Sequence, residues 1–168
     1  MTHLASITLG SNIGNKIFNI KKAIDYISKA VEVKRVSNFY ETDPWGYESK
    51  NSFINAGVLI ETIFSPEDLL AFLKQIEKKM GRQKTEPGYQ DRIIDLDILT
   101  YDYIKLSAIN LVIPHPKITE RKFSIVILKD IFNDEVIPGL NKNAHELLSQ
   151  CEDNLKVQMI NEVQTYSS

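Results

Sequence analysis

Cysteine is almost absent from this sequence of 168 residues, since Cys151 is the single example. One thiol can form neither an internal disulfide framework nor a zinc site built from several cysteines. The sequence also lacks a run of about 18 apolar residues, which a membrane-spanning helix needs, and its first residues lack the cationic and apolar segments of a leader. We therefore expect a cytoplasmic protein without a membrane partner.

An excess of either charge is also missing, because 20 Lys and Arg residues face 22 Asp and Glu residues, for a formal net charge of −2. This balance argues against a broadly basic nucleic-acid-binding protein and favours small-molecule partners. Apolar residues make up 43% of the chain, enough to bury a core without disulfides or a structural metal. We expect a single domain over residues 1–168, acting as a monomer.

Hydrophobic periodicity predicts alternating strands and helices. Strands are expected over residues 4–9, 31–40, 53–64, 93–101 and 111–113, and helices over 17–27, 66–80 and 121–132. The segment 10–14 is predicted to be a tight turn, and the tail after residue 143 to begin as a helix and end extended over 155–160. The order β-α-β-β-α-β predicts an α+β fold, with a ferredoxin-like split βαβ core and helices packed on a mostly antiparallel sheet.

Two acidic residues share one face of the strand predicted over 93–101. The two-residue period of a strand points Asp95 and Asp97 to the same side and the neighbouring apolar residues to the other. An acidic, solvated strand face is the commoner explanation of such a pair. Aspartate is nevertheless disfavoured in strands, and adjacent carboxylates repel unless a cation lies between them. Oxygen ligands of this kind suit Mg²⁺.

Arginine is scarce, and its positions are informative. The chain has four, Arg35, Arg82, Arg92 and Arg121, of which the last three bracket the aspartate pair. Arginine grips phosphate with a planar, permanently charged fork, although capping a helix or flanking a strand would also explain two of them. His115 lies between two prolines that can aim its ring at a phosphate, whereas a lone histidine is more often structural. The polar segment 82–92 is expected to be a mobile loop.

Short motifs along residues 4–140 resemble the 6-hydroxymethyl-7,8-dihydropterin pyrophosphokinase family and leave 141–168 as a C-terminal extension. The motifs are Leu9-Gly10-Ser11-Asn12, Tyr40-Glu41-Thr42, Phe53-Ile54-Asn55-Ala56, Ile76-Glu77, Gly81-Arg82, Arg92-Ile93-Ile94-Asp95-Leu96-Asp97, and Pro114-His115-Pro116 with Arg121 and Phe123. The stretch from residue 92 to residue 97, followed by the later Pro-His pair, is the most specific part of this resemblance.

The resemblance implies an enzyme of folate biosynthesis that transfers the terminal diphosphate of ATP to the hydroxymethyl oxygen of 6-hydroxymethyl-7,8-dihydropterin and releases AMP. It implies that Asp95 and Asp97 hold two Mg²⁺ ions and act in catalysis with Arg82 and Arg92. The other implied contacts are Arg82, Arg92, His115 and Arg121 with phosphate; Glu77, Lys84, Ile98, Leu111 and Val112 with ATP; and Thr42, Trp45, Phe53, Asn55 and Phe123 with the pterin.

Asn55 supports this interpretation because an amide in an otherwise apolar strand is costly to bury unless it is hydrogen-bonded, and it offers both a donor and an acceptor. An exposed position on an edge strand is the alternative explanation. Two other functions stay open at this stage. A nucleotidyltransferase would use the same aspartate pair but release diphosphate, and a catalytically silent α+β binding module would consume no ATP.

Overall fold

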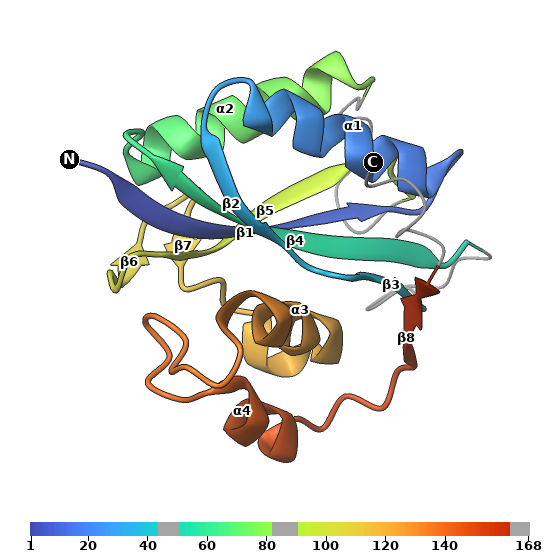
Figure 1. The fold of residues 1–168 in the computed structure, drawn as a ribbon, viewed down its shortest axis with the longest axis vertical. Helices are drawn as coiled ribbons and strands as arrows, with labels where there is room; N and C mark the ends of the chain where they lie inside the picture. Colours follow the sequence, from blue (N-terminus) through green and yellow to red (C-terminus); the bar gives the residue numbers. More distant parts are fainter. Residues whose placement is uncertain (44–50, 82–90, 162–168) are drawn as a thin grey trace.

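The computed structural model of the chain describes residues 1–43, 51–81 and 91–161. Three of the predicted site residues, Trp45, Arg82 and Lys84, lie outside these ranges, as does most of the loop predicted over 82–92. A central sheet separates two layers of helices, with α1 and α2 on one side and α3 and α4 on the other (Figure 1). The two faces of this sheet therefore have different surroundings.

The sheet has the strand order of a split βαβ fold. Its strands are β1 (His3–Ser11), β2 (Glu32–Val36), β3 (Phe39–Thr42), β4 (Phe53–Thr62), β5 (Asp95–Tyr101) and β8 (Val157–Ile160). They follow the order β5-β1-β4-β3-β8, with β2 also paired to β4, and all of these pairings are antiparallel. Because β4 lies between β1 and β3, the predicted α+β fold with its split βαβ core is confirmed. A small second sheet joins β6 (Leu106–Ser107) to β7 (Val112–Ile113).

Three of the helices, α1, α2 and α4, begin at capping side chains. The helices are α1 (Lys16–Ser28), α2 (Pro66–Lys79), the 3₁₀ helix η1 (Ile118–Glu120), α3 (Lys122–Phe132) and α4 (Ala144–Gln150). Asn15 caps α1, Ser65 caps α2, and Asn143 forms a reciprocal capping box with Glu146 at α4. In the described part of the chain, no helix is long and apolar enough to span a membrane.

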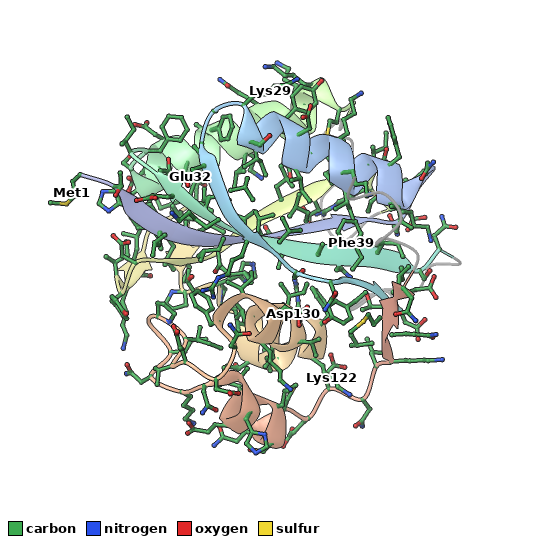
Figure 2. All side chains as sticks on the ribbon, viewed as in Figure 1. Met1, Lys29, Glu32, Phe39, Lys122 and Asp130 are labelled. Carbon is green, nitrogen blue, oxygen red and sulfur yellow. The ribbon has the colours of Figure 1, made fainter. Side chains whose placement is uncertain are left out.

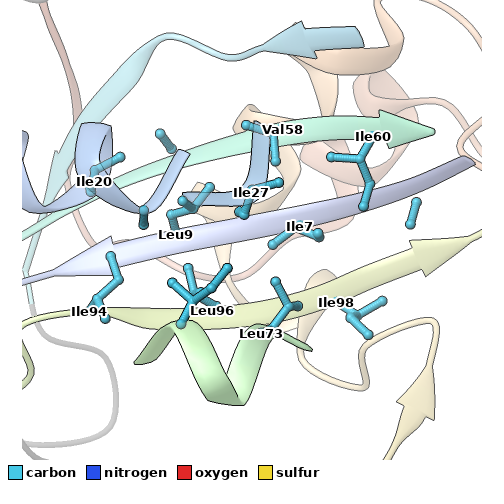
Figure 3. Packing of buried hydrophobic residues seen from close by; sticks show 14 of the residues in the cluster. Ile7, Leu9, Ile20, Ile27, Val58, Ile60, Leu73, Ile94, Leu96 and Ile98 are labelled. Carbon is cyan, nitrogen blue, oxygen red and sulfur yellow. The ribbon is translucent and has the colours of Figure 1, made fainter. Parts of the chain in front are cut away.

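The larger apolar core lies between the sheet and the helices α1 and α2. Ile7 and Leu9 on β1 and Leu96 on β5 point toward this layer and are almost completely buried (Figure 3). They pack in one cluster with helix residues such as Ile20 and Leu73. Burial of this apolar surface supplies most of the favourable free energy of folding.

The opposite face of the sheet packs on α3, partly through polar contacts. The Tyr40 hydroxyl on β3 donates to Asp130 Oδ2 at 2.6 Å, and the Asn38 amide donates to the same oxygen at 3.0 Å. Asp130 lies on α3 beneath the sheet (Figure 2). A nearby guanidinium nitrogen of Arg35 donates to the Ile131 carbonyl at 2.6 Å. These contacts fix the C-terminal half of α3 against β2 and β3.

Two local expectations from the sequence are wrong. Gly10 and Ser11 continue strand β1 instead of forming a turn, and the chain turns at Gly14, where φ is +74°. The single strand expected over 31–40 is divided into β2 and β3, because the Ser37 hydroxyl accepts a hydrogen bond from the Gly57 amide at the break. The expected helix and extended segment of the tail are confirmed as α4 and β8.

Candidate active site

Asp95 and Asp97 lie on the face of β5 that points away from α1 and α2, as the two-residue period predicts. Their cross-strand partners on β1 are Gly10 and Thr8, respectively. The intervening Leu96 is buried in the opposite apolar cluster. The two carboxylates are therefore side by side on the α3 side of the sheet.

The charge of Asp97 is poorly compensated. Burial, together with the neighbouring Asp95 carboxylate and to a lesser extent Glu77, raises the pKa of Asp97 to about 7, although Arg121 and Lys74 oppose this shift. In the described ranges, no group of three or more His, Cys, Asp or Glu side chains could enclose a metal ion. The Asp95 and Asp97 carboxylates could hold Mg²⁺, which commonly takes its other ligands from phosphate and water.

Arg92 is anchored on both its main chain and its side chain. A guanidinium nitrogen lies 3.1 Å from Asp95 Oδ1. The Arg92 amide donates to Asn12 Oδ1 at 2.6 Å, and the Asn12 amide donates to the Arg92 carbonyl at 3.0 Å. Asn12 Nδ2 also donates to Asp91 Oδ1 at 2.7 Å. Asn12, which is fully buried, thus positions the segment that carries Arg92, a role that the sequence analysis did not assign.

His115 is held as a neutral hydrogen-bond donor. Its amide donates to the Leu99 carbonyl at 2.9 Å, and its Nδ1 accepts from the Lys117 amide at 3.1 Å. Burial and, secondly, the charge of Arg121 lower the pKa of His115 to about 4. Because Nδ1 is an acceptor in this neutral ring, the proton lies on Nε2. Arg121 influences both Asp97 and His115, so the structure brings these groups together with Arg92 and Asp95.

Glu77 lies at the outer edge of β5, which among the described strands pairs with β1 alone. Its Oε2 accepts a hydrogen bond from the Leu96 amide at 2.8 Å, and Lys74 Nζ lies 3.7 Å from Oε1. The structure places Ile98 in the buried cluster, and Leu111 packs against that cluster. Val112, at the start of β7, is 38% exposed. These residues thus flank one edge of the sheet.

Of the residues predicted to bind pterin, Asn55, Thr42 and Phe53 lie on strands to the other side of β1. Asn55 is 5% exposed, and its Nδ2 donates to Thr42 Oγ1 at 2.7 Å. Since Asn55 pairs with Gly10 on one side and with β3 on the other, it does not lie on an edge strand, and that alternative is wrong. Phe53 begins β4 and Phe123 lies in the first turn of α3, and both are partly buried.

Comparison with known proteins identifies the family. The profile of the 7,8-dihydro-6-hydroxymethylpterin-pyrophosphokinase (HPPK) family matches residues 6–133. The chain belongs to the HPPK family. This confirms the family that the sequence motifs predict and, with it, the expected class of reaction, pyrophosphoryl transfer to a hydroxymethyldihydropterin.

Two bacterial HPPK relatives match over most of their length. The 2-amino-4-hydroxy-6-hydroxymethyldihydropteridine pyrophosphokinase of Bacillus subtilis is 39% identical over 133 residues, which are 78% of this chain and 79% of that protein. The enzyme of the same name from Porphyromonas gingivalis is 38% identical over 129 residues, covering 74% of this chain and 88% of its own. The residues 6–133 that the HPPK profile matches include all the site elements described above.

Solved HPPK structures share the fold. Wild-type Plasmodium falciparum HPPK-DHPS superimposes with a TM-score of 0.70 at 18% identity and covers 89% of this chain. The chain spans 43% of that longer protein. Helix α4 and strand β8 lie beyond the residues that the HPPK profile matches, so the C-terminal part is the less typical end of this chain.

Proposed function

We propose that the chain is an ATP-dependent, Mg²⁺-requiring HPPK that forms one domain. The hydroxymethyl oxygen of the pterin attacks the β-phosphorus of ATP, the bond from that phosphorus to the oxygen bridging the α-phosphate breaks, AMP leaves, and the hydroxyl proton is released. One observation carries this proposal. On a single sheet face, Asp95 and Asn55 are the two cross-strand neighbours of Gly10, so a carboxylate pair and a buried amide are about 10 Å apart.

The phosphate side of the site is built to balance charge. Two Mg²⁺ ions on Asp95 and Asp97 would neutralise the charge that develops on the phosphates, and they would also offset the burial and the Asp95 charge that raise the pKa of Asp97. Arg92 and Arg121 supply fixed positive charges, and neutral His115 donates from Nε2. Catalysis then depends on positioning and electrostatic stabilisation.

Two residues outside the described ranges complete the phosphate side of the proposal. Arg82 acts in catalysis with Arg92, and Lys84 binds ATP. Both precede Arg92 in the sequence. The main chain of Arg92 itself is held by hydrogen bonds to Asn12.

The pterin lies between Phe53 and Phe123, with Asn55 reading its hydrogen-bonding edge and Thr42 and Trp45 beside it. The Thr42 hydroxyl holds Nδ2 of Asn55, which orients the amide before the pterin binds. Aromatic rings on either side suit a flat heterocycle. The pocket therefore combines shape selection with one oriented polar group.

The nucleotide lies along the β5 edge of the sheet, next to Ile98, Leu111 and Val112. Apolar side chains suit the adenine ring. Glu77 keeps this edge in place through the Leu96 amide, so its part in ATP binding is to shape the edge as well as to face the nucleotide.

The proposal also includes a cytoplasmic monomer whose partners are small molecules and not nucleic acid. The single cysteine and the net charge of −2 support this statement. Analytical ultracentrifugation tests the oligomeric state, where sedimentation at the 19.2 kDa of one chain is expected.

Product analysis tests the reaction itself. The protein is incubated with ATP, Mg²⁺ and 6-hydroxymethyl-7,8-dihydropterin, and phosphorus NMR follows the products with and without EDTA. We expect AMP and the pterin diphosphate in equal amounts, and neither product in EDTA. Release of inorganic diphosphate would instead indicate a nucleotidyltransferase, and unchanged ATP would indicate a binding module without catalytic activity.

A further inference from the structure

Gly10 is the next-to-last residue of β1 and pairs with strands on both sides, a position where glycine weakens a sheet and needs a reason. The reason is not its backbone conformation, because the glycines with positive φ in the described residues are Gly14, Gly81 and Gly139. Gly10 lies on β1 directly between Asn55 on β4 and Asp95 on β5. It therefore separates the amide side of the site from the carboxylate side.

The space above Gly10 is already occupied by the Asn55 side chain. A Cβ atom at Gly10 would lie 2.7 Å from Asn55 Oδ1 and 3.6 Å from Phe53 Cδ1. Asn55 has little freedom to withdraw, because it is buried and its Nδ2 is held by Thr42 Oγ1. Any side chain at Gly10 would therefore turn the Asn55 amide away from its present orientation.

We propose that Gly10 is a specificity-determining position, whose missing side chain keeps Asn55 oriented toward the donor–acceptor edge of a pterin-like bicyclic heterocycle. This inference rests on the proposed function, in which Asn55 binds the pterin. Gly10 is a positioning residue, since it acts through Asn55.

A second glycine provides a matched control. Gly57 also lies in a central strand, but a Cβ atom there would meet Ile127 Cγ2 at 2.3 Å and Ile131 Cδ1 at 3.2 Å on helix α3. Gly57 thus makes room for helix packing and not for Asn55. Gly57→Ala is expected to lower Tm and leave the pterin KM of the folded enzyme within about twofold of the wild-type value.

The test is a double-mutant cycle with Gly10→Ala, Asn55→Ala and the combined variant. The measurements are Tm, kcat, the KM for 6-hydroxymethyl-7,8-dihydropterin, and the Kd of a non-hydrolysable ATP analogue with Mg²⁺. Gly10→Ala is expected to raise the pterin KM about tenfold or more and to leave the nucleotide Kd within about twofold. In the Asn55→Ala background, where the clashing amide is absent, it should add about twofold or less to the KM.

Equal pterin KM values for Gly10→Ala and the wild type would overturn the inference, and so would a KM increase of the same size in both backgrounds. If Gly10→Ala alone does not fold, the combined variant decides. A Tm close to that of Asn55→Ala would support the contact, and failure to fold would overturn it. A wild-type protein that forms no AMP would instead refute the proposed function, so the two failures are distinguishable.

Discussion

The two faces of the central sheet are made from alternate residues of the same strands, yet they differ in chemistry. On β1, Ile7 and Leu9 point into the apolar layer beneath α1 and α2, while Thr8 and Gly10 point to the α3 side. The α3 face accordingly carries the carboxylates and the Asn55 amide. The difference teaches that the face beneath α1 and α2 serves the apolar core, whereas the α3 face combines a second apolar cluster with the residues of the site.

The α3 face buries polar side chains, which lose hydrogen bonds to water, and the other face buries apolar side chains. Its buried polar groups need partners, and the Ser6–Thr100 hydroxyl pair at 2.6 Å and the Asn55–Thr42 bond at 2.7 Å supply them. The negative charge of Asp97 is only partly offset by its surroundings, because burial and the Asp95 carboxylate raise its pKa. If Asp97 binds a cation, as proposed, the protein without that cation is expected to be less stable than it could be.

The largest expected effect is a loss of activity, without unfolding, when a carboxylate on the α3 face of the sheet is replaced. Asp95→Asn and Asp97→Asn are each expected to lower kcat by about 100-fold or more, because each removes a proposed ligand of the ions that stabilise transition-state charge. Steady-state AMP production measures the effect. Asp25→Asn, on the exposed surface of α1, is the control, and near wild-type turnover in either site variant would refute the metal assignment.

The opposite result, a loss of stability with little loss of activity, is expected when a cavity is made in the apolar layer beneath α1 and α2. Leu9 is fully buried, so Leu9→Ala is expected to lower the free energy of unfolding by about 2–5 kcal/mol through lost burial and an unfilled cavity. The KM values of the folded fraction should stay unchanged. Urea denaturation measures the loss, and Leu4→Ala on the same strand, 45% exposed, should cost far less. Equal losses would mean that the apolar layer does not dominate stability.

A smaller effect is expected at the junction of the sheet with α3. Tyr40→Phe removes the hydroxyl that donates to Asp130, and we expect a loss of about 1–2 kcal/mol in unfolding free energy. Burial, followed by the Asp130 contact, raises the pKa of Tyr40, so the hydroxyl stays a donor throughout the neutral range. Tyr103→Phe, at a site that is 79% exposed, is the control in the same denaturation experiment.

A fourth expected effect is a dependence of stability on pH that comes from the polar face. The folded pKa of Asp97 is about 7 against an ordinary 3.8, so the folded state binds the proton more tightly, and this stabilisation is lost as pH rises from 3.8 through about 7. His115, whose pKa is lowered to about 4, acts in the opposite direction below its ordinary pKa of 6.5.

Comparison of the wild type with Asp97→Asn separates the contribution of Asp97 to the pH dependence from that of His115. Without Mg²⁺, the Tm advantage of Asp97→Asn over the wild type should grow by roughly 2–4 °C or more between about pH 5 and pH 8. Differential scanning calorimetry measures it. Saturating Mg²⁺ and ATP should reduce this difference, and a constant difference across the pH range would show that Asp97 is ionised at all of these pH values.

Much of the fold follows from local patterns. The alternation around Leu96 predicts both the strand β5 and the shared face of Asp95 and Asp97, because a strand has a two-residue period whatever surrounds it. Likewise, Ser65 and Pro66 mark the start of α2, where the cap is made by residues only three apart in sequence. The family motifs add the reaction class, which a short pattern of side chains can specify.

The contacts between residues far apart in the chain were decided only by the tertiary structure. The hydrogen bond from Arg92 to Asn12 spans 80 residues, and that from Leu96 to Glu77 spans 19. The strand position of Gly10, its contact with Asn55, and the neutral state of His115 also depend on which elements pack together. A local pattern sets periodicity and turns, whereas pairing of distant strands, burial and the resulting pKa shifts exist only once the sheet and its helices are assembled.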